Sequence, residues 1–262
     1  MDVIIQPTAA RAEQLAAAII AKALRAKPHL VLGLATGRTM EGVYGHLARL
    51  HREQALDFSR CRTFNLDEYI GLGSGHPGSY RHYMREMLFR HVNLMPENTH
   101  LPDGLAVDLS AECEAYEARI RACGGIDLQL LGIGSDGHIG FNEPLSALRS
   151  RTREKGLTRA TREQNAAMFG GNPEDVPARA ITMGVGTILD SRRCLLLAVG
   201  ADKARILAKA VEGPITSMIS ASALQLHASC TVIVDEAAAA QLEGAEYYRW
   251  ILANEPEWAE FR

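Results

Sequence analysis

Three titratable side chains lie close together in a glycine-rich segment of the chain: Asp136, His138 and Glu143. An imidazole can take up or release a proton near neutral pH, and a neighbouring carboxylate can fix its tautomer and raise its basicity. The glycines around these residues would let the backbone approach a ligand closely. Because the segment follows an apolar stretch of strand type, we expect an acid–base site here. A glycine-rich turn with a surface histidine is the competing interpretation.

The same segment contains the string G-x-G-x-x-G, from Gly132 to Gly137. This string indicates a dinucleotide site only when a helix follows it immediately. Gly140 and Pro144 would interrupt any such helix, so the sequence does not predict a dinucleotide cofactor at this place.

A second group of acids, Asp67 and Glu68, stands directly after the apolar stretch 61–66. A carboxylate at the end of a strand can remove a proton from a carbon next to a carbonyl, provided that it is positioned and partly desolvated. The competing interpretation is a solvated turn or a helix cap, because most acids in loops are exposed to water.

A third segment, 32–39, joins a predicted strand to a predicted helix. We expect Thr39 to cap that helix. Free backbone N–H groups and the helix dipole would make the turn a cradle for phosphate, and the hydroxyls of Thr36 and Thr39 would add donors. An ordinary turn between a strand and a helix is the competing interpretation.

The elements that must position these groups alternate along the chain. Strands are expected at 3–6, 29–34, 61–66, 126–131, 195–199 and 231–234, and helices at about 8–27, 40–53, 79–91 and 108–123, with two more beginning near 202 and 235. This alternation predicts an α/β fold: a doubly wound, mostly parallel, Rossmann-like sheet with helices on both faces. Residues 132–150 are expected to form a long irregular loop. Without a linker or an internal repeat, 1–262 is expected to form a single domain. All three chemical segments then lie at the carboxyl ends of strands, where such sheets bind ligands.

Composition argues against several other classes. Hydrophobic residues make up 47% of the 262 residues, and the net charge of −3 gives no support for binding nucleic acid. No stretch approaches the ~20 apolar residues that span a bilayer, and the first residues do not resemble a signal peptide, so no membrane association is expected. The five cysteines include no C-x-x-C pair, and the histidines show no H-E-x-x-H spacing. We therefore expect reduced thiols, a cytoplasmic location and no metal site.

Several motifs occur in one order over almost the whole chain: 66–72 (LDEYIGL), 76–80 (HPGSY), 134–144 (GSDGHIGFNEP), 150–153 (SRTR), 182–187 (TMGVGT) and 224–227 (LQLH). Together they resemble the glucosamine-6-phosphate deaminase family, which also includes isomerases of galactosamine 6-phosphate. The resemblance implies that glucosamine 6-phosphate and water give fructose 6-phosphate and ammonia, with no organic cofactor and no metal.

The resemblance also implies roles for individual residues. Asp67 would be the base that moves a proton between C2 and C1 through an enediol-type intermediate. His138 would be the acid and base of ring opening, with Asp136 and Glu143 as its electrostatic partners. Lys203 would be a phosphate ligand.

Two positions depart from the family pattern at the phosphate site. The turn usually reads Thr/Ser-Gly-Gly-Thr-Pro, whereas here Thr36 and Gly37 are followed by Arg38, Thr39 and Met40. Further on, Ala167 stands where the family has a phosphate-binding arginine. We predict that Arg38 supplies the charge that is missing at 167, because a guanidinium can bind phosphate from either wall. In the competing interpretation, Arg38 points to solvent, and phosphate binds weakly or another substrate is preferred.

Resemblance to the longer family members further implies a homo-oligomer, specifically a homo-hexamer, that N-acetylglucosamine 6-phosphate activates. Ser146, Arg153 and Lys155 match the allosteric phosphate ligands, although Ala147 replaces a usual serine. A C-terminal extension of about 244–262 resembles the segment that completes that site and contains Tyr247 and Tyr248. The competing interpretation is a solvated basic strip at 151–155.

Three other functions remain open. A deaminase of galactosamine 6-phosphate would use the same residues. A 6-phosphogluconolactonase-like hydrolase would not explain the full set of Asp67, Asp136, His138 and Glu143. A non-catalytic sugar-phosphate sensor on the same fold often carries a DNA-binding module, which is not evident here, and retention of all four residues favours an enzyme.

Overall fold

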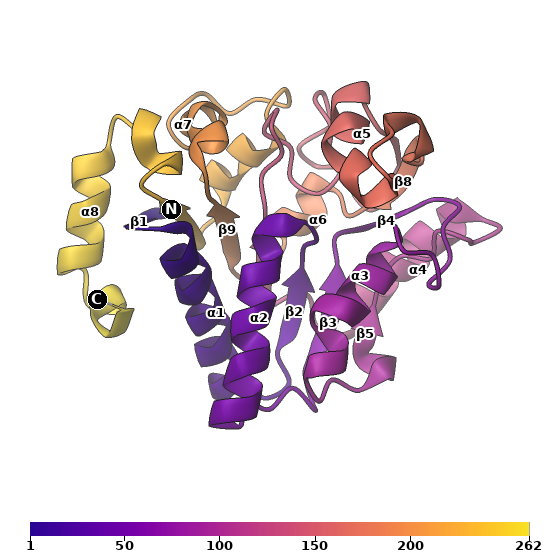
Figure 1. Cartoon of the computed structure of the whole chain (residues 1–262), viewed down its shortest axis with the longest axis horizontal. Coiled ribbons are helices and arrows are strands. Elements are labelled where there is room, and N and C mark those ends of the chain that lie inside the picture. The colour runs from indigo at the N-terminus through magenta and orange to yellow at the C-terminus, as the bar shows by residue number, and fades with distance from the viewer. Residues whose placement is uncertain (262) are drawn as a thin grey trace.

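A parallel sheet of seven strands forms the centre of the computed structural model, which describes residues 1–261 (Figure 1). The strand order is β1-β10-β9-β6-β2-β3-β5. The bounds are β1 Asp2–Gln6, β2 Val31–Leu34, β3 Arg62–Asn65, β5 Thr99–His100, β6 Leu128–Leu131, β9 Cys194–Ala198 and β10 Cys230–Asp235. Every residue of β9 and β10 is buried, as expected for central strands that are covered on both faces. The predicted α/β class with a mostly parallel sheet is confirmed.

Helices cover the sheet. Their bounds are α1 Ala9–Ala26, α2 Arg38–Gln54, α3 Tyr80–Met87, α4 Leu109–Ala122, α5 Arg159–Asn165, α6 Val185–Leu189, α7 Ala204–Val211 and α8 Ala245–Asn254. Figure 1 shows α1, α2 and α3 on the face of the sheet toward the viewer, with the fainter α4 behind it. Thr8 caps α1 by accepting a hydrogen bond from the Arg11 N–H, as the sequence predicts. No helix among the described residues is long and apolar enough to cross a bilayer.

A second, antiparallel sheet was not predicted. It has the order β4-β8-β7, with β4 at Asp67–Tyr69, β7 at Arg153–Gly156 and β8 at Arg179–Thr182. The competing interpretation of a solvated turn at Asp67 and Glu68 is wrong: both residues are buried in β4, and Asp67 pairs with Thr182. Its other form, a helix cap, holds for Glu68, which accepts hydrogen bonds from the first turn of α3. Pairing with β8, on one side of β4, fixes the backbone of Asp67.

Two predicted helix starts also need correction. Helix α2 begins at Arg38 with Gly37 as its N-cap, two residues before the predicted start at Met40, so Thr39 is not the cap. A glycine suits this place because its φ is +112°, a value that other residues rarely adopt. The helix predicted from about 235 is only a short 3-10 turn at Ala238–Gln241, whereas the predicted irregular loop 132–150 contains neither helix nor strand.

The three chemical segments leave the same edge of the large sheet. Strands β9, β6, β2 and β3 are neighbours. The phosphate turn follows β2, Asp67 follows β3, the loop with His138 follows β6, and Lys203 follows β9. The chain continues from β2 toward β3 on one side and from β6 toward β9 on the other. The order therefore reverses between β2 and β6, which is where a doubly wound sheet opens a crevice for a ligand.

Candidate active site

One cavity of about 610 Å³ opens at this edge of the sheet. Its walls include Asp67, His138, Lys203 and the whole turn from Thr36 to Thr39. The structure therefore brings together the predicted base, the predicted ring-opening group and the predicted phosphate site. Asp136 and Glu143 are not among the lining residues, so they can act only through His138.

Asp67 is a buried carboxyl, only 5% exposed, at the start of β4. Burial, and after it the charge of Glu68, raises the pKa of Asp67 to about 8, although a hydrogen bond from the Phe141 N–H opposes the shift. The backbone comes close on the other side: a Cβ at Gly140 would lie 3.3 Å from Asp67 Oδ2, and its φ is +56°. The carboxyl is thus held in a tight, dry place where it can act as a strong base.

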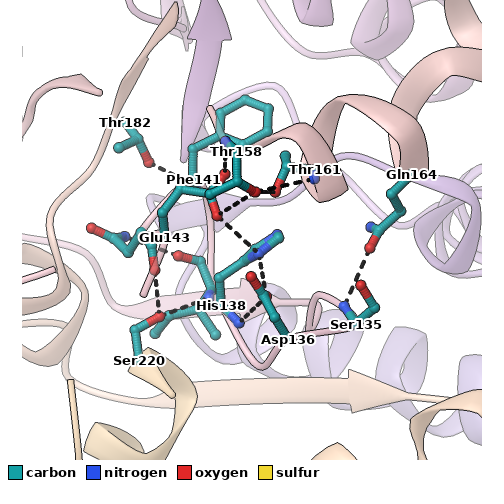
Figure 2. Close-up of polar contacts among 12 residues, drawn as sticks. Ser135, Asp136, His138, Phe141, Glu143, Thr158, Thr161, Gln164, Thr182 and Ser220 are labelled. Atoms are coloured by element: carbon teal, nitrogen blue, oxygen red, sulfur yellow. Dashed lines mark hydrogen bonds and ion pairs between the residues drawn. The ribbon is translucent and has the colours of Figure 1, made fainter. Parts of the chain in front are cut away.

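His138 lies between two carboxylates (Figure 2). Its Nδ1 is 2.6 Å from Asp136 Oδ1 and 4.0 Å from Glu143 Oε2, and its backbone N–H donates to Asp136 Oδ1 at 3.2 Å. Burial alone raises the pKa of Asp136, but the hydrogen bonds and charge of His138 outweigh it and lower that pKa. The ring is packed against Gly134, where a Cβ would come within 2.4 Å of it. Asp136 and Glu143 therefore fix the orientation of the imidazole.

Glu143 is held from the other side by Thr158, the residue that caps α5. The Thr158 N–H donates to Oε1 at 3.0 Å, and its hydroxyl donates to Oε2 at 3.3 Å. Figure 2 shows the polar contacts running in sequence from Asp136 to His138, from His138 to Glu143 and from Glu143 to Thr158. With Glu143 only 2% exposed, these donors replace the water that its charge would otherwise need.

The ligand atoms of Asp136, His138 and Glu143 lie within 4.8 Å of one another, a spacing that a metal ion could also bridge. Glu143 already accepts hydrogen bonds from Thr158, and Asp136 accepts one from the His138 backbone. This arrangement fits an imidazole that exchanges protons with a ligand, and we interpret the cluster in that way.

The phosphate wall of the cavity begins at the N-terminus of α2. No side chain among the described residues caps this helix, and the N–H groups of Arg38 and Thr39 are available to an anion, whereas that of Met40 donates to the Gly37 carbonyl. Arg38 is the first helical residue, and the left-handed φ falls on Gly37, so an arginine fits here without backbone strain. The side chain of Lys203 is 15% exposed, and its Nζ is 3.8 Å from Asp202 Oδ2.

Arg38 and Ala167 line the same cavity, although Arg38 is exposed overall. The coupling predicted for these two positions therefore meets its geometric requirement, which is a shared site. Whether Arg38 replaces the missing charge stays a prediction.

The predicted allosteric residues fall into two groups. Arg153 and Lys155 lie on β7, and Arg153 Nη1 donates at 2.9 Å to Oδ1 of Asn142, which lies in the loop that carries the buried Ser146. Tyr247 is 61% exposed on α8, a helix that packs against β1 at the far end of the large sheet. Figure 1 places α8 and β8, the partner of β7, at opposite ends of the molecule. One chain alone does not bring Tyr247 to the other three residues.

Sequence reasoning assigned no role to several lining residues. Tyr80 lies in the cavity wall, and Gln164 reaches the catalytic loop, where its Oε1 accepts a hydrogen bond from the Ser135 N–H at 3.2 Å. Tyr80 belongs to the motif at 76–80. A threonine is a common N-cap residue, and this is the sequence signal for the cap that Thr158 forms on α5. Gln164 gave no signal, because its segment shows no apolar pattern.

A buried carboxyl and an imidazole share a cavity with a lysine and a helix N-terminus that no described side chain caps. This combination is typical of enzymes that move protons on small phosphorylated molecules. The comparison with known proteins identifies the family within that class. Residues 6–233 match the family described as glucosamine-6-phosphate isomerases/6-phosphogluconolactonase. The chain belongs to this family.

Individual relatives agree with one branch of the family. The chain is 52% identical over 258 residues to a glucosamine-6-phosphate deaminase of Arthrobacter sp. (strain FB24), covering 98% of this chain and 99% of the relative. It is 49% identical to the enzyme of that name from Streptomyces coelicolor, with the same coverage. A solved monomeric glucosamine-6-phosphate deaminase superposes with a TM-score of 0.90 at 46% identity, covering 92% of this chain and 100% of the other. The 6-phosphogluconolactonase of Trypanosoma cruzi, with a TM-score of 0.73 at 21% identity over 92% of this chain and 97% of the other, shares the fold.

Proposed function

We infer that this chain is an enzyme that converts glucosamine 6-phosphate and water into fructose 6-phosphate and ammonia. The observation that carries the inference is that Asp67 and His138 face one cavity together with the uncapped N-terminus of α2. A phosphate held at the helix would place the sugar against the acid–base pair. Relatives that share about half of their residues with this chain carry the name of this activity.

We propose that His138 opens the sugar ring. The imidazolium, stabilised by Asp136 and Glu143, gives its proton to the ring oxygen, and the imidazole takes the proton of the C1 hydroxyl as the C1–O bond to the ring breaks. The product is the open-chain amino aldehyde, and the number of protons on the site is unchanged.

We propose that Asp67 then moves one proton along the chain of the sugar. Its carboxylate takes the proton from C2 while the imidazolium of His138 gives a proton to the C1 oxygen, which forms an enol-type intermediate that bears the amino group at C2. Return of the proton from Asp67 to C1 gives a protonated imine at C2. Water adds to this carbon and gives its proton to the imidazole of His138, and ammonia leaves, so both groups regain their starting protonation and the overall reaction consumes one water. Asp67 suits the step because burial raises its pKa to about 8, nearer to that of a carbon acid next to a carbonyl.

Ammonia release tests the function directly. Purified protein is incubated separately with glucosamine 6-phosphate, galactosamine 6-phosphate and unphosphorylated glucosamine. The Asp67→Asn variant, purified in the same way, is the control for a contaminating deaminase. We expect release from glucosamine 6-phosphate first, and none from the variant. Equal or faster release from galactosamine 6-phosphate would reassign the substrate. Hydrolysis of 6-phosphogluconolactone without any ammonia release would reassign the reaction.

Assembly, activation and location are proposals that rest on resemblance. We propose a homo-hexamer that N-acetylglucosamine 6-phosphate activates; because Tyr247 lies far from Arg153 within one chain, a complete effector site would need a second copy. A monomer in sedimentation velocity, as in the solved relative, would contradict the assembly, and hyperbolic kinetics that the effector leaves unchanged would contradict the activation. We also propose a cytoplasmic location, which the free thiols of all five cysteines support.

A further inference from the structure

Glu68 is a buried carboxylate, 3% exposed, that takes no part in the chemistry described above. Its two oxygens accept four hydrogen bonds of 2.9–3.0 Å, from the Tyr69 N–H, the Ser79 hydroxyl, the Tyr80 N–H and the Arg81 N–H. Ser79 caps α3, and the last two donors belong to its first turn, where a negative charge is favourable. Glu68 therefore joins β4, the strand of the base Asp67, to the N-terminus of α3.

The next residues of the same helix reach the phosphate turn. Tyr83, on the first turns of α3, donates its hydroxyl proton to the Gly37 carbonyl at 2.8 Å. Tyr80 and Thr36, the first residue of that turn, line the same cavity. Both tyrosines are nearly buried, so their contacts are not competing with bulk water.

Aromatic packing fixes the position of the first turn of α3. Tyr80 stacks on Phe141 with 5.8 Å between ring centres, and its hydroxyl is 3.4 Å from that of Tyr69. Phe141 in turn donates its N–H to Thr182, the strand partner of Asp67. The first turn of α3 is thus fixed to β4, the strand of Asp67, by Glu68 and to the phosphate turn by Tyr83.

We propose that Glu68 and Tyr83 are positioning residues that set the spacing between the base Asp67 and the phosphate-binding turn. This proposal rests on the proposed function, and it assigns to α3 the discrimination between phosphorylated and unphosphorylated amino sugars. A phosphate bound at Gly37 can present C1 and C2 to the base only if that spacing is held, since small displacements of the reacting atoms cost rate.

Tyr83→Phe removes one hydrogen bond to the turn and keeps the ring. A single buried hydrogen bond contributes ~0.5–1.5 kcal/mol, so we expect KM for glucosamine 6-phosphate to rise about two- to tenfold. The value of kcat should fall as well, because a displaced phosphate presents C1 and C2 less well to Asp67, whereas kcat/KM for unphosphorylated glucosamine should not change, because that sugar makes no phosphate contact.

Tyr116→Phe is the matched control. Tyr116 is a fully buried tyrosine of α4 whose hydroxyl donates to the Asn65 carbonyl at 2.7 Å, so the variant loses the same group from the same kind of environment. It should lower the free energy of unfolding without changing the preference for the phosphorylated substrate.

Glu68→Gln tests the attachment of α3 to β4. The amide of glutamine has only one acceptor oxygen, so it can accept only some of the four hydrogen bonds. The contact that holds the strand of Asp67 to α3 is then weakened, and we expect kcat to fall and KM to rise together. Ser79→Ala removes one donor to Glu68 together with the side-chain cap of α3, and it should show the same two changes in smaller size because three donors to Glu68 remain. If Glu68→Gln does not fold, Ser79→Ala and Tyr83→Phe still decide the proposal.

Binding of inorganic phosphate, measured by isothermal titration, separates this proposal from the proposed function. Weaker phosphate binding by Tyr83→Phe than by the wild type and Tyr116→Phe would support the spacer, even if no amino sugar were deaminated. Equal phosphate binding by all three proteins, with an unchanged preference for the phosphorylated sugar in Tyr83→Phe, would overturn it. Equal changes in Tyr83→Phe and Tyr116→Phe would also overturn it, since they would show a general loss of stability.

Discussion

Replacing Asp67 by asparagine should abolish turnover and, at the same time, stabilise the fold. The carboxyl is 5% exposed and its pKa is raised from 3.8 to about 8, chiefly by burial. In the unfolded chain the group ionises near its ordinary pKa, so between these two values the folded protein holds a proton that the unfolded chain has lost. Folding is therefore penalised increasingly as the pH rises, because the folded state binds the extra proton.

The size of this penalty follows from the shift. Between about pH 5 and about pH 8 the folded and unfolded states differ by nearly one proton, and at about 1.4 kcal/mol per pH unit the wild type should lose about 4 kcal/mol of stability from this one group. Asparagine does not titrate, so Asp67→Asn should not lose it. Above the folded pKa of about 8 the difference between the two proteins should level off.

Urea unfolding at several pH values, followed by circular dichroism, measures the effect. The free energy of unfolding of Asp67→Asn minus that of the wild type should grow from about pH 5 to about pH 8. Asp175→Asn, at an exposed aspartate, is the control and should follow the wild type. Ammonia release by Asp67→Asn should fall by ~10²–10⁴-fold or more. Parallel stability curves for Asp67→Asn and the wild type, or more than about a tenth of the wild-type activity, would refute the reasoning.

Three further outcomes are expected. In the wild type, kcat/KM for glucosamine 6-phosphate should rise as the pH increases through about 8, since Asp67 must lose its proton to act as the base, and a flat profile across that region would contradict this role. His138→Gln should slow the pyranose substrate by ~10²–10⁴-fold but an open-chain analogue, or exchange of the C2 proton, far less; equal losses would remove the ring-opening role. Arg38→Ala should lower kcat/KM roughly tenfold or more, the value of a charge-assisted contact of ~1.5–3 kcal/mol, and Ala167→Arg in that background should restore part of the loss. An unchanged kcat/KM in Arg38→Ala at low salt would leave the compensation without support.

Strands that are buried on both faces were predictable from their sequences. The stretches at 195–199 and 231–234 are continuous apolar runs, and the structure places strands there within one residue at either end. Since parallel strands present their carboxyl ends at one edge, the alternation of strands and helices was enough to gather Asp67, His138 and the turn from Thr36 to Thr39 at a single cavity, whereas Lys203 was assigned only through the family resemblance.

The region 151–194 was not predictable in the same way. Strand β7, with the sequence REKG, alternates half-buried and exposed residues and contains no apolar side chain. Its place is set by pairing with β8, and β8 in turn pairs with β4, more than a hundred residues earlier in the chain. Such pairing depends on contacts between distant segments, which hydrophobic periodicity within a short window does not report.

The neighbouring acids Asp67 and Glu68 show where local pattern reaches its limit. In sequence they are two carboxylates after one apolar strand, and nothing in their types distinguishes a base from an anchor. The structure separates them because they lie on a strand, where successive side chains point to opposite faces. Asp67 faces the cavity, with one N–H of the backbone as its hydrogen-bond donor, whereas Glu68 meets four donors at the start of α3. Burial raises the pKa of both carboxyls, so the direction of the pKa shift does not separate them. A carboxylate that accepts four hydrogen bonds is suited to hold a helix in place, and one that faces the cavity with few donors is free to take a proton, so the two roles follow from the number of donors that each side chain meets.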